Sequence, residues 1–441
     1  SKIRHYEVEY LRQIGCKDRR DKMSEKPQIS FPLDLPDVRV LKTKMNKRGD
    51  YVITVESTIT YTQCHKCGRK IEQVHGHSHW ITLRHLPILG QVVWIRIRPR
   101  RYKCPYCDNH PTTTQTHSWY DTKSPHTRAY DDYLLKRLIN STVEDVSRKE
   151  DVGYDAVEGT LDRRIDRVVD WSEYKELAVI GMDEIALKRG KRDFVLIITT
   201  QQVDGRVAIL AVLADRKKET ARQLLESIPK RLRTTIKTVC TDMWEGYINA
   251  VKEFTQAHRL SVDVVIDRFH VAKNYRQCVD NLRKREIRRL KKELPEEQYD
   301  AIKGVMWAVR KNNLDLNEEQ RQKLQRLFEY APDLKQAYTF REELSAIFQM
   351  PLSRDQAVIR LKRWQDKVRH SDLKCFNTFL KTLDKWRNEI ANYFVKRLSS
   401  GFVEGLNNRI KTIKRRCYGL SNIVHLFQRI YLDLEGFRLF A

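Results

Sequence analysis

The chain has 441 residues, enough for about two to four domains, and 41% of them are hydrophobic, which supports folded cores. No apolar run approaches the ~18–20 residues of a membrane span, so a membrane-spanning class is excluded. Lys and Arg number 84 against 58 Asp and Glu, which gives a net charge of +26. Because neutralising phosphates releases counterions, this excess indicates a nucleic-acid partner; a ribosome-like or merely soluble basic protein is the alternative.

The first part of the chain is predicted to be β-rich. Residues 1–34 are polar and charged, lack the apolar core of a signal peptide and are predicted to be a leader. Residues 35–120 form the predicted β domain. Its segments VRVLKTK (38–44) and YVITVESTITY (51–61) have a period near two and many β-branched residues, which predicts two strands joined at NKRGD. WITLRHLPILGQVVWIRIRPRRYK (80–103) continues as a hairpin.

Two C-x-x-C pairs flank this hairpin, Cys64 and Cys67 in CHKC and Cys104 and Cys107 in CPYC. Four thiolates satisfy tetrahedral zinc, so the pairs predict a structural Zn²⁺ site; a chance cysteine pattern is the alternative. Without a signal peptide the pairs indicate metal ligands in a reducing compartment, and the protein is expected in the cytoplasm. The histidines of HGHSH and His85 are possible substitute ligands, but with four cysteines available we expect them on the surface or facing DNA.

Residues 121–172 are predicted to form a helical DNA-binding domain. STVEDVSRKEDVGYDAVEGTLDRRIDRVV (141–169) contains a short helix, a turn with a glycine and a second helix, which is typical of a helix-turn-helix. Arg163 and Arg164 of the second helix are the predicted DNA contacts. The face that carries them also holds acids, so the signal for base recognition is weak.

Residues 173–270 change to an α/β pattern. Three apolar strands, KELAVIGMDEIALKRG, RDFVLIITTQQVDG and RVAILAVLADRK, are followed by helix, strand, helix and strand. The order βββαβαβ predicts a mixed α/β sheet, with the fifth strand in SVDVVIDRFH (261–270). Residues 271–398 show only helical periodicity, and residues 399–441 contain SSGFVEGLNNRIKTIKRRCYG.

Acidic residues follow two of these strands. Asp183 ends the apolar run of VIGMDE, and Asp242 has the same place in KTVCTDMW. Carboxylates at the ends of adjacent core strands converge on one edge of a sheet, where divalent metals that activate phosphodiester chemistry can bind. The alternative is that these acids cap helices, and Asp242 is a fair N-cap candidate. Glu184 is expected to point to the opposite side of the sheet.

Four motifs in this order, GMDE, TDMWEGY, VIDRFHV and EGLNNRIKTIKRRCYG, resemble those of the DDE transposases of bacterial insertion sequences, and more narrowly the group named ISL-three. The resemblance covers residues 35–435. It implies a multidomain α/β plus α protein in which a zinc-binding β-rich module and a helix-turn-helix precede an RNase H-like catalytic core. The helical residues 271–398 would interrupt this core as an all-α insertion.

The resemblance also implies site residues. Asp183, Asp242 and Glu404 would hold two Mg²⁺ or Mn²⁺ ions. Asp267 and His270 match the family's Asp-x-x-His signature and would support the site. Asp267 rivals Asp242 as second ligand, but it is placed on the fifth strand, where the family pattern has a supporting residue, so Asp242 is favoured. Taken alone, Glu404 would simply be a first-turn acid favoured by the helix dipole.

The resemblance implies contacts with DNA beside the metals. The basic residues after the glutamate would hold phosphates, and two amides would orient the scissile strand: Lys411, Lys414, Arg415 and Arg416, with Asn407 and Asn408. Trp307, Trp364 and Trp386 are candidates to stack on an unpaired base, although core packing is the favoured role for each.

The implied activity is transposition. Water would cleave a phosphodiester at the element end, and the freed 3′-hydroxyl would attack target DNA. The partners would be double-stranded DNA at the terminal inverted repeats and at the target, and a homodimer would join two ends in the bacterial cytoplasm, at the nucleoid. Two alternatives are a catalytically silent DNA-binding regulator, which the intact acids argue against, and an RNase H-like nuclease, for which the N-terminal modules are less natural.

Overall fold

The computed structural model describes residues 32–440 apart from 188–193, 203, 398–400, 419 and 421, and for residues 401–404 it describes the backbone alone. Most of the predicted leader therefore lies outside the described residues. The chain divides into two compact units, Ser1–Arg128 and Ala129–Ala441. Among the helices that the structure describes, none is long and apolar enough to cross a membrane.

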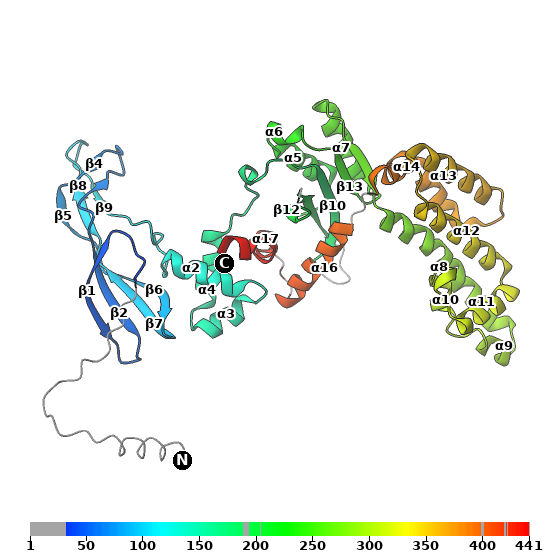
Figure 1. Cartoon of the computed structure of the whole chain (residues 1–441), viewed down its shortest axis with the longest axis horizontal. Coiled ribbons are helices and arrows are strands. Elements are labelled where there is room, and N and C mark those ends of the chain that lie inside the picture. Colours follow the sequence, from blue (N-terminus) through cyan, green and yellow to red (C-terminus); the bar gives the residue numbers. More distant parts are fainter. Residues whose placement is uncertain are drawn as a thin grey trace, which may run out of the picture. The chain divides into compact units, whose positions relative to one another are not determined.

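The N-terminal unit contains a four-stranded sheet in the order β1–β2–β7–β6 (Figure 1). Its strands are β1 (Val38–Met45), β2 (Tyr51–Ser57), β6 (Ile81–Ile88) and β7 (Gln91–Ile97). The two predicted hairpins, β1–β2 and β6–β7, are antiparallel, and β2 joins β7 in parallel. Ile53 and Val55 on β2 are buried and alternate with less buried neighbours, so the period of two in the sequence reflects one face packed on a core.

The rest of this unit consists of short strands around the cysteines. They are β3 (Thr62–Gln63), β4 (Lys70–Ile71), β5 (Val74–His77), β8 (Arg100–Lys103) and β9 (Thr112–Thr114). The second strand of the predicted hairpin was expected to run to Lys103, but β7 ends at Ile97 and β8 pairs with β5 and β9 instead. Pro99 lies between them and has no N–H to donate, which breaks the ladder at this point.

The second unit begins with helices α2 (Arg128–Leu138), α3 (Val143–Glu150) and α4 (Tyr154–Arg164). The predicted pair of short helices, α3 and α4, is present. The Thr142 hydroxyl caps α3 by accepting a 2.9 Å hydrogen bond from the backbone N–H of Asp145. Asp151 ends the helix in the left-handed conformation (φ 50°), and this turn lets Val146 and Val157 pack in one core.

A five-stranded sheet follows in the order β12–β11–β10–β13–β14, and it confirms the predicted mixed α/β sheet (Figure 1). Its strands are β10 (Val179–Ala186), β11 (Phe194–Gln201), β12 (Val207–Leu213), β13 (Thr238–Thr241) and β14 (Asp263–Ile266). The first three strands of the chain order pair antiparallel, whereas β10, β13 and β14 are parallel. The short helix η1 (Trp171–Glu173) precedes the sheet.

Helices cover both faces of this sheet. They are α5 (Lys218–Ser227), α6 (Lys230–Arg233) and α7 (Glu245–Ala257), and later α16 (Gly401–Arg416) and α17 (Ile423–Phe440). Ile180 and Met182 of β10 share a buried cluster with residues of α5 and α7, whereas Ile185 clusters with residues of α16 and α17. Because side chains alternate along a strand, Asp183 belongs to the face that α16 covers and Glu184 to the opposite face.

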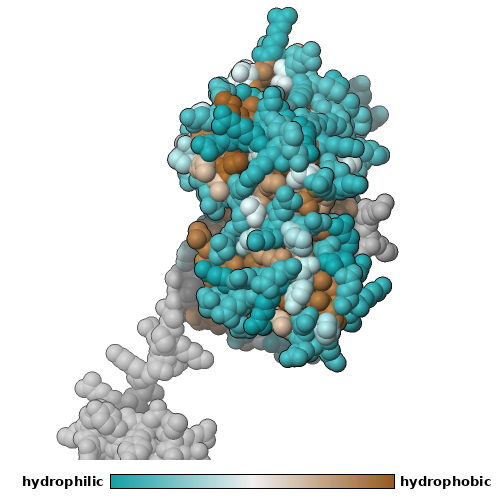
Figure 2. Space-filling view, turned by 90° about the vertical axis from the view of Figure 1, so that its right-hand side faces the viewer, coloured by the Kyte–Doolittle hydropathy of each residue, from teal (hydrophilic) through white to brown (hydrophobic). Residues whose placement is uncertain are grey.

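Between β14 and α16 the described chain is helical. The helices are α8 (Arg268–Glu293), α9 (Glu296–Asp300), α10 (Met306–Arg310), η2 (Asn313–Asp315), α11 (Glu318–Tyr330), α12 (Pro332–Gln349), α13 (Arg354–Arg369), η3 (Lys374–Phe376), α14 (Asn377–Ala391) and α15 (Tyr393–Lys396). This stretch returns to the sheet where Asn392 donates a 2.9 Å hydrogen bond to the carbonyl oxygen of Val264. Figure 2 shows that its outer face is mainly hydrophilic, with hydrophobic surface in scattered patches.

The three tryptophans of this helical stretch have different environments. Trp364 and Trp386 are buried, and the Trp364 indole N–H donates to the carbonyl oxygen of Phe340 (2.9 Å), so their favoured role in the core is confirmed. Trp307 is 63% exposed, so core packing was the wrong expectation for it. The short helix α10 turns Ala308 and Val309 inward, which leaves Trp307 outside.

Candidate active site and zinc site

Three aspartates lie side by side where the parallel strands end. Met182 of β10 is opposite Thr241 of β13, and Thr241 is opposite Ile266 of β14. The residues that follow these three positions are Asp183, Asp242 and Asp267. Because the three strands run in the same direction, their carboxylates come to one edge of the parallel part of the sheet.

The sequence predicted that Asp183 would end its strand, but Asp183 lies inside β10. The strand continues to Ala186 because it pairs with β11 over its whole length. The expected convergence with Asp242 still occurs, since the partner strand β13 stops at Thr241. Asp183 thus projects from within β10, beside the end of the shorter strand β13.

Asp183 contacts groups from two other parts of the chain. Its Oδ2 accepts a 2.5 Å hydrogen bond from Nδ2 of Asn407 on α16, and its Oδ1 accepts one of 2.7 Å from the backbone N–H of Glu184. The Nε2 atom of His270, in the first turn of α8, lies 3.8 Å from Asp183 Oδ1. Asn407 and His270 therefore approach one carboxylate from elements that are remote in sequence.

Asp242 closes a turn just before α7, where its Oδ1 accepts a 2.9 Å hydrogen bond from the N–H of Trp244. Trp244 itself is the N-cap of α7 and, among the described residues, no side chain caps this helix, so the N-cap alternative for Asp242 is wrong. The pKa of Asp242 is raised to about 6, mainly by burial and also by the charges of Glu184 and Asp183. The hydrogen bond from Trp244 and the nearby His270 act in the opposite direction. Burial is also the main cause that raises the pKa of Asp183.

Asp267 has a different setting from the one that the sequence predicted. It was expected on the fifth strand, but β14 ends at Ile266 and Asp267 is the N-cap of α8. Its Oδ1 accepts a 3.0 Å hydrogen bond from the N–H of Phe269, and the residue is only 2% exposed. The side chain satisfies an N–H at the helix start, which is why the strand ends here and His270 is helical.

Glu404 belongs to the first turn of α16, and its side chain lies outside the described residues. Its backbone position is one turn before Asn407, whose side chain reaches Asp183. Positions three apart on a helix share a face, so position 404 is on the face of α16 that meets β10.

Glu184 lies on the face of β10 opposite to Asp183, as expected, although its charge is close enough to Asp242 to raise the pKa of that carboxyl. Its Oε1 accepts a 2.9 Å hydrogen bond from the hydroxyl of Tyr247 on α7, and its Oε2 lies 3.8 Å from Nη1 of Arg216. The Arg216 guanidinium stands 4.5 Å from the ring centroid of Trp244. The contacts of Tyr247 and Arg216 with Glu184 were not predicted from the sequence, because only the folded sheet brings these residues together.

The four basic residues of α16 that were predicted to contact DNA divide into two pairs. Lys414 donates through Nζ to the carbonyl oxygens of Ala186 (2.5 Å) and Leu187 (2.6 Å). Arg416 forms a 2.9 Å ion pair with the buried Asp433 of α17. The other members of the predicted DNA-contacting set on α16, namely Lys411, Arg415 and Asn408, are exposed to solvent.

The two arginines predicted to contact DNA from α4 are engaged within the helical domain. Arg163 forms a 2.9 Å ion pair with the buried Asp131, and Arg164 forms one of 2.6 Å with Asp132. Both acids lie on α2, so the two arginines hold α4 against that helix. Each arginine side chain keeps about a quarter of its surface exposed, and contact with DNA stays a prediction.

The four cysteines of the C-x-x-C pairs form one cluster. Among the described residues, Cys64, Cys67, Cys104 and Cys107 are the group whose ligand atoms could hold a metal ion, with sulfurs all within 4.8 Å of one another. Backbone N–H groups of Cys67 and Lys66 hold the pKa of Cys64 down, at about 6, which favours a thiolate. Gly68 (φ +70°) closes the first turn in a conformation that favours glycine. Four thiols at these distances fit tetrahedral zinc.

We expected His85 on the surface or facing DNA, and the structure contradicts this. His85 is buried on β6, and its Nδ1 lies 2.9 Å from the hydroxyl oxygen of Thr127. Burial lowers its pKa. The histidines at 75, 77 and 79 are exposed, as predicted.

Comparison with protein families gives two matches. The family model DDE_Tnp_ISL3, described as a transposase, matches residues 180–430, more than half of the chain. A second model, described as the zinc-finger of transposase IS204/IS1001/IS1096/IS1165, matches residues 60–107, which include all four clustered cysteines. This match and the geometry of the thiols support a structural zinc ion.

Similar proteins extend over nearly the whole chain. The chain is 29% identical over 391 residues to the transposase for insertion sequence element IS1001 of Bordetella parapertussis, covering 87% of this chain and 91% of that protein. It is 24% identical over 408 residues to the transposase for IS1557 of Mycobacterium tuberculosis, covering 85% and 86%. The Drosophila P element transposase strand transfer complex aligns at 11% identity with a TM-score of 0.42, over 69% of this chain and 91% of that one. The chain belongs to the ISL3 family of transposases and is a transposase of an insertion sequence.

Proposed function

We propose that this transposase binds the terminal inverted repeats of its element and cleaves and joins DNA strands with divalent metals held by Asp183, Asp242 and Glu404. The observation that carries the proposal is the parallel register of β10, β13 and β14, which brings Asp183 beside Asp242. The sheet order, with β10 central between an antiparallel and a parallel half, supports an RNase H-like catalytic core.

The sheet edge that carries Asp183, Asp242 and Asp267, which we call the acidic edge, suits a hard divalent cation such as Mg²⁺ or Mn²⁺. Such ions prefer carboxylate oxygens, and here two partly buried carboxyl groups have raised pKa values because burial and neighbouring acids oppose their charge. A cation bound beside these acids would offset both the cost of burying their charges and the repulsion between them. Two ions bound there would supply activation of the attacking oxygen and stabilisation of the leaving oxygen.

The surrounding residues orient the acids. Asn407 fixes Asp183 through its amide N–H, and Asp267 caps the helix that carries His270 next to Asp183. The Oδ1 atom of Asn407 is buried and has no hydrogen-bond partner among the described residues, so it is available to a donor on a bound group. Asn407 would thereby link the position of Asp183 to that of the substrate.

The chemistry requires no nucleophilic side chain. Water attacks the phosphorus of a phosphodiester at the element end, and the bond to the 3′-oxygen breaks to release a 3′-hydroxyl. This hydroxyl then attacks a phosphodiester of target DNA in a second in-line displacement. Exposed Lys411 and Arg415 on α16 would hold phosphates of the bound strand beside the acids, and a homodimer would bring two element ends together.

Strand cleavage and joining of DNA that carries the inverted repeat tests the proposal. We expect products with the wild-type protein only when Mg²⁺ or Mn²⁺ is present, and none with Asp183→Asn, Asp242→Asn or Glu404→Gln. Glu253→Gln is the control, because Glu253 is a partly exposed acid on α7 that pairs with Lys218 and is not one of the three proposed metal ligands. Wild-type activity in all three site variants would show that the catalytic assignment is wrong.

A further inference from the structure

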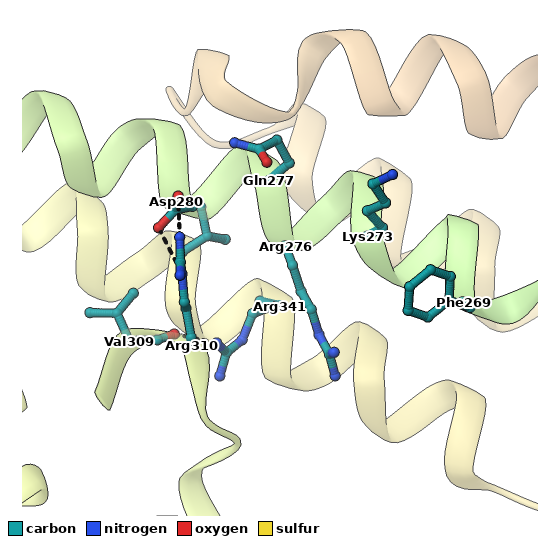
Figure 3. A pocket seen from close by; sticks show the side chains of 9 residues that line it. Phe269, Lys273, Arg276, Gln277, Asp280, Val309, Arg310 and Arg341 are labelled. Carbon is teal, nitrogen blue, oxygen red and sulfur yellow. Dashed lines mark hydrogen bonds and ion pairs between the residues drawn. The ribbon is translucent and has the colours of Figure 1, made fainter. Parts of the chain in front are cut away.

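A cavity of about 330 Å³ lies between α8, α10 and α12, outside the acidic edge (Figure 3). Four of the residues that line it are basic: Lys273 and Arg276 on α8, Arg310 on α10 and Arg341 on α12. Asp280 is its acidic lining residue. We call this cavity the α8 pocket.

The α8 pocket has an excess of positive charge that its own acid does not neutralise. Asp280 pairs with Arg310 (3.0 Å), Arg283 (2.9 Å) and Lys284 (3.1 Å). Burial opposes the charge of Asp280, but these three hydrogen-bond donors outweigh it and hold its pKa well below the usual range. One carboxylate therefore already serves three cations, and it leaves net positive charge at the wall of the cavity.

Two further cations have nothing to neutralise them among the described residues. Lys273 and Arg276 are exposed on α8, and no described carboxylate forms an ion pair with either of them. Figure 3 shows Arg276 extending from α8 toward the side of the cavity where Arg341 lies. These two side chains are available to an anionic ligand.

Arg341 gives the cavity a fixed donor. Its side chain is only 2% exposed and is held by the carbonyl oxygens of Val309 and Lys311 and by the carboxylate of Glu342. Its Nε atom is buried without a hydrogen-bond partner among the described residues. A buried guanidinium with an unused N–H costs free energy unless a ligand accepts from it.

One helix, α8, connects the α8 pocket to the acidic edge. Phe269, which lines the pocket and is 48% exposed, precedes His270 at the start of α8. Phe269, Lys273, Arg276 and Asp280 follow the helical period, so they form one stripe along α8. Arg276 lies about 9 Å along the helix axis from His270.

We propose that the α8 pocket binds a phosphate group of a nucleotide, through Lys273, Arg276 and Arg341, while Phe269 offers its face to the base. Guanidinium and ammonium groups recognise phosphate oxygens, and an exposed aromatic ring accepts any base by stacking. The inference deepens the proposed function, on which it rests: the nucleotide belongs to the DNA strand that leaves the acidic edge. A free nucleoside triphosphate has the same chemistry and is the other source to be tested.

Binding measurements without divalent metal test the pocket separately from catalysis. The probes are a fluorescent inverted-repeat duplex with a single-stranded extension, and fluorescent ATP. The variants are Lys273→Ala/Arg276→Ala and Phe269→Ala. The control is Arg288→Ala/Lys292→Ala, which removes two exposed cations of the same helix that do not line the pocket. Circular dichroism and thermal melting establish that each variant folds.

The two variants have different expected signatures. Loss of two phosphate contacts makes the negative slope of log K against log salt shallower by about 1.4 for a single strand. Loss of the stacking ring weakens binding on the order of tenfold and leaves that slope unchanged. The control changes neither quantity to this extent.

The two probes identify the source of the nucleotide. Loss of DNA binding assigns the pocket to the DNA strand, and loss of ATP binding alone assigns it to a free nucleotide; either result supports a phosphate site. Folded variants that bind both probes like the wild type, or no more weakly than the control, would overturn it. Since no cleavage is measured, failure of the catalytic proposal would not produce this outcome.

Discussion

Asn407 of α16 donates a hydrogen bond to Asp183 of β10 across 224 residues of sequence. The contact fixes one carboxylate of the acidic edge to the helix whose first turn contains Glu404. The long helical stretch between β14 and α16 is thus closed by a contact at the site itself. The geometry of the acids depends on this helix as well as on the sheet.

Replacing Asn407 by Asp is expected to lower strand cleavage about 10- to 100-fold. The new carboxylate would face Asp183 in place of a donor, and two like charges at this distance oppose each other's ionisation and position. Asn377→Asp is the control, since Asn377 is exposed on α14, has no assigned role in DNA contact and undergoes the same change of charge. Equal losses in both variants, measured at equal DNA binding, would contradict a specific role for the Asn407–Asp183 contact.

The basic residues of α16 are expected to have separate roles. Lys411→Ala/Arg415→Ala should make the negative slope of log K against log salt for duplex DNA shallower by about 1.8, because two phosphate contacts are lost. Lys414→Met should lower the free energy of unfolding by about 2 kcal/mol, since two carbonyl oxygens lose a charged donor. Binding isotherms at several salt concentrations and thermal melts measure these effects. The assignment fails if Lys414→Met changes the salt slope more than the double variant does.

The acidic edge is expected to destabilise the metal-free protein at neutral and alkaline pH. The pKa of Asp242 is raised from 3.8 to about 6. The free energy of unfolding therefore includes its full favourable contribution below pH 3.8, and this contribution is lost as the pH rises through about 6. At pH 8 without Mg²⁺, Asp242→Asn should therefore be more stable than the wild type by about 2–3 kcal/mol. The difference should disappear below pH 4.

Asp215→Asn is the control for this pH dependence. Asp215 is partly exposed, and the backbone N–H of Lys217 lowers its pKa, so its contribution has the opposite sign and is lost as the pH falls. Denaturant unfolding at pH 4, 6 and 8 gives both differences. A destabilised Asp242→Asn variant at pH 8 would mean that burial of this carboxyl is already compensated in the metal-free protein.

The four-cysteine cluster is expected to hold one zinc ion that the N-terminal unit needs for folding. Cys104→Ser should remove the zinc and the unfolding transition of this unit, because structural zinc contributes apparent free energies of about 10–16 kcal/mol. Cys375→Ser, a partly buried cysteine of the helical stretch, should change neither. Metal analysis by mass spectrometry and calorimetry measure both properties. A folded, zinc-free wild type would exclude the structural role.

Features with a local signal could be predicted from the sequence. The C-x-x-C spacing identified the cluster of Cys64, Cys67, Cys104 and Cys107, and apolar periodicity identified the mixed sheet. The start of α8 was missed, although Asp267 before a helical pattern is a typical N-cap signal that would have indicated it.

Tertiary contacts between distant residues could not be predicted. Nothing near Lys414 in the sequence indicates that it donates to Ala186 and Leu187 rather than to DNA, and Arg163 gives no sign of its partner Asp131. The extension of β10 past Asp183 likewise depends on its pairing with β11. In each case the deciding partner is remote in sequence, so only the packed fold brings it into contact.

The measurement that tests the central claim most directly is a change of metal specificity in strand cleavage. Thiolate is a softer ligand than carboxylate, so a cysteine in place of a metal ligand disfavours Mg²⁺ and tolerates Mn²⁺ better. We predict that Asp183→Cys and Asp242→Cys are inactive with Mg²⁺ and partly recover with Mn²⁺, whereas Asp267→Cys, which loses a helix cap, shows no such recovery. Recovery by Mn²⁺ in Asp267→Cys but not in Asp242→Cys would contradict the assignment of Asp242 as a metal ligand.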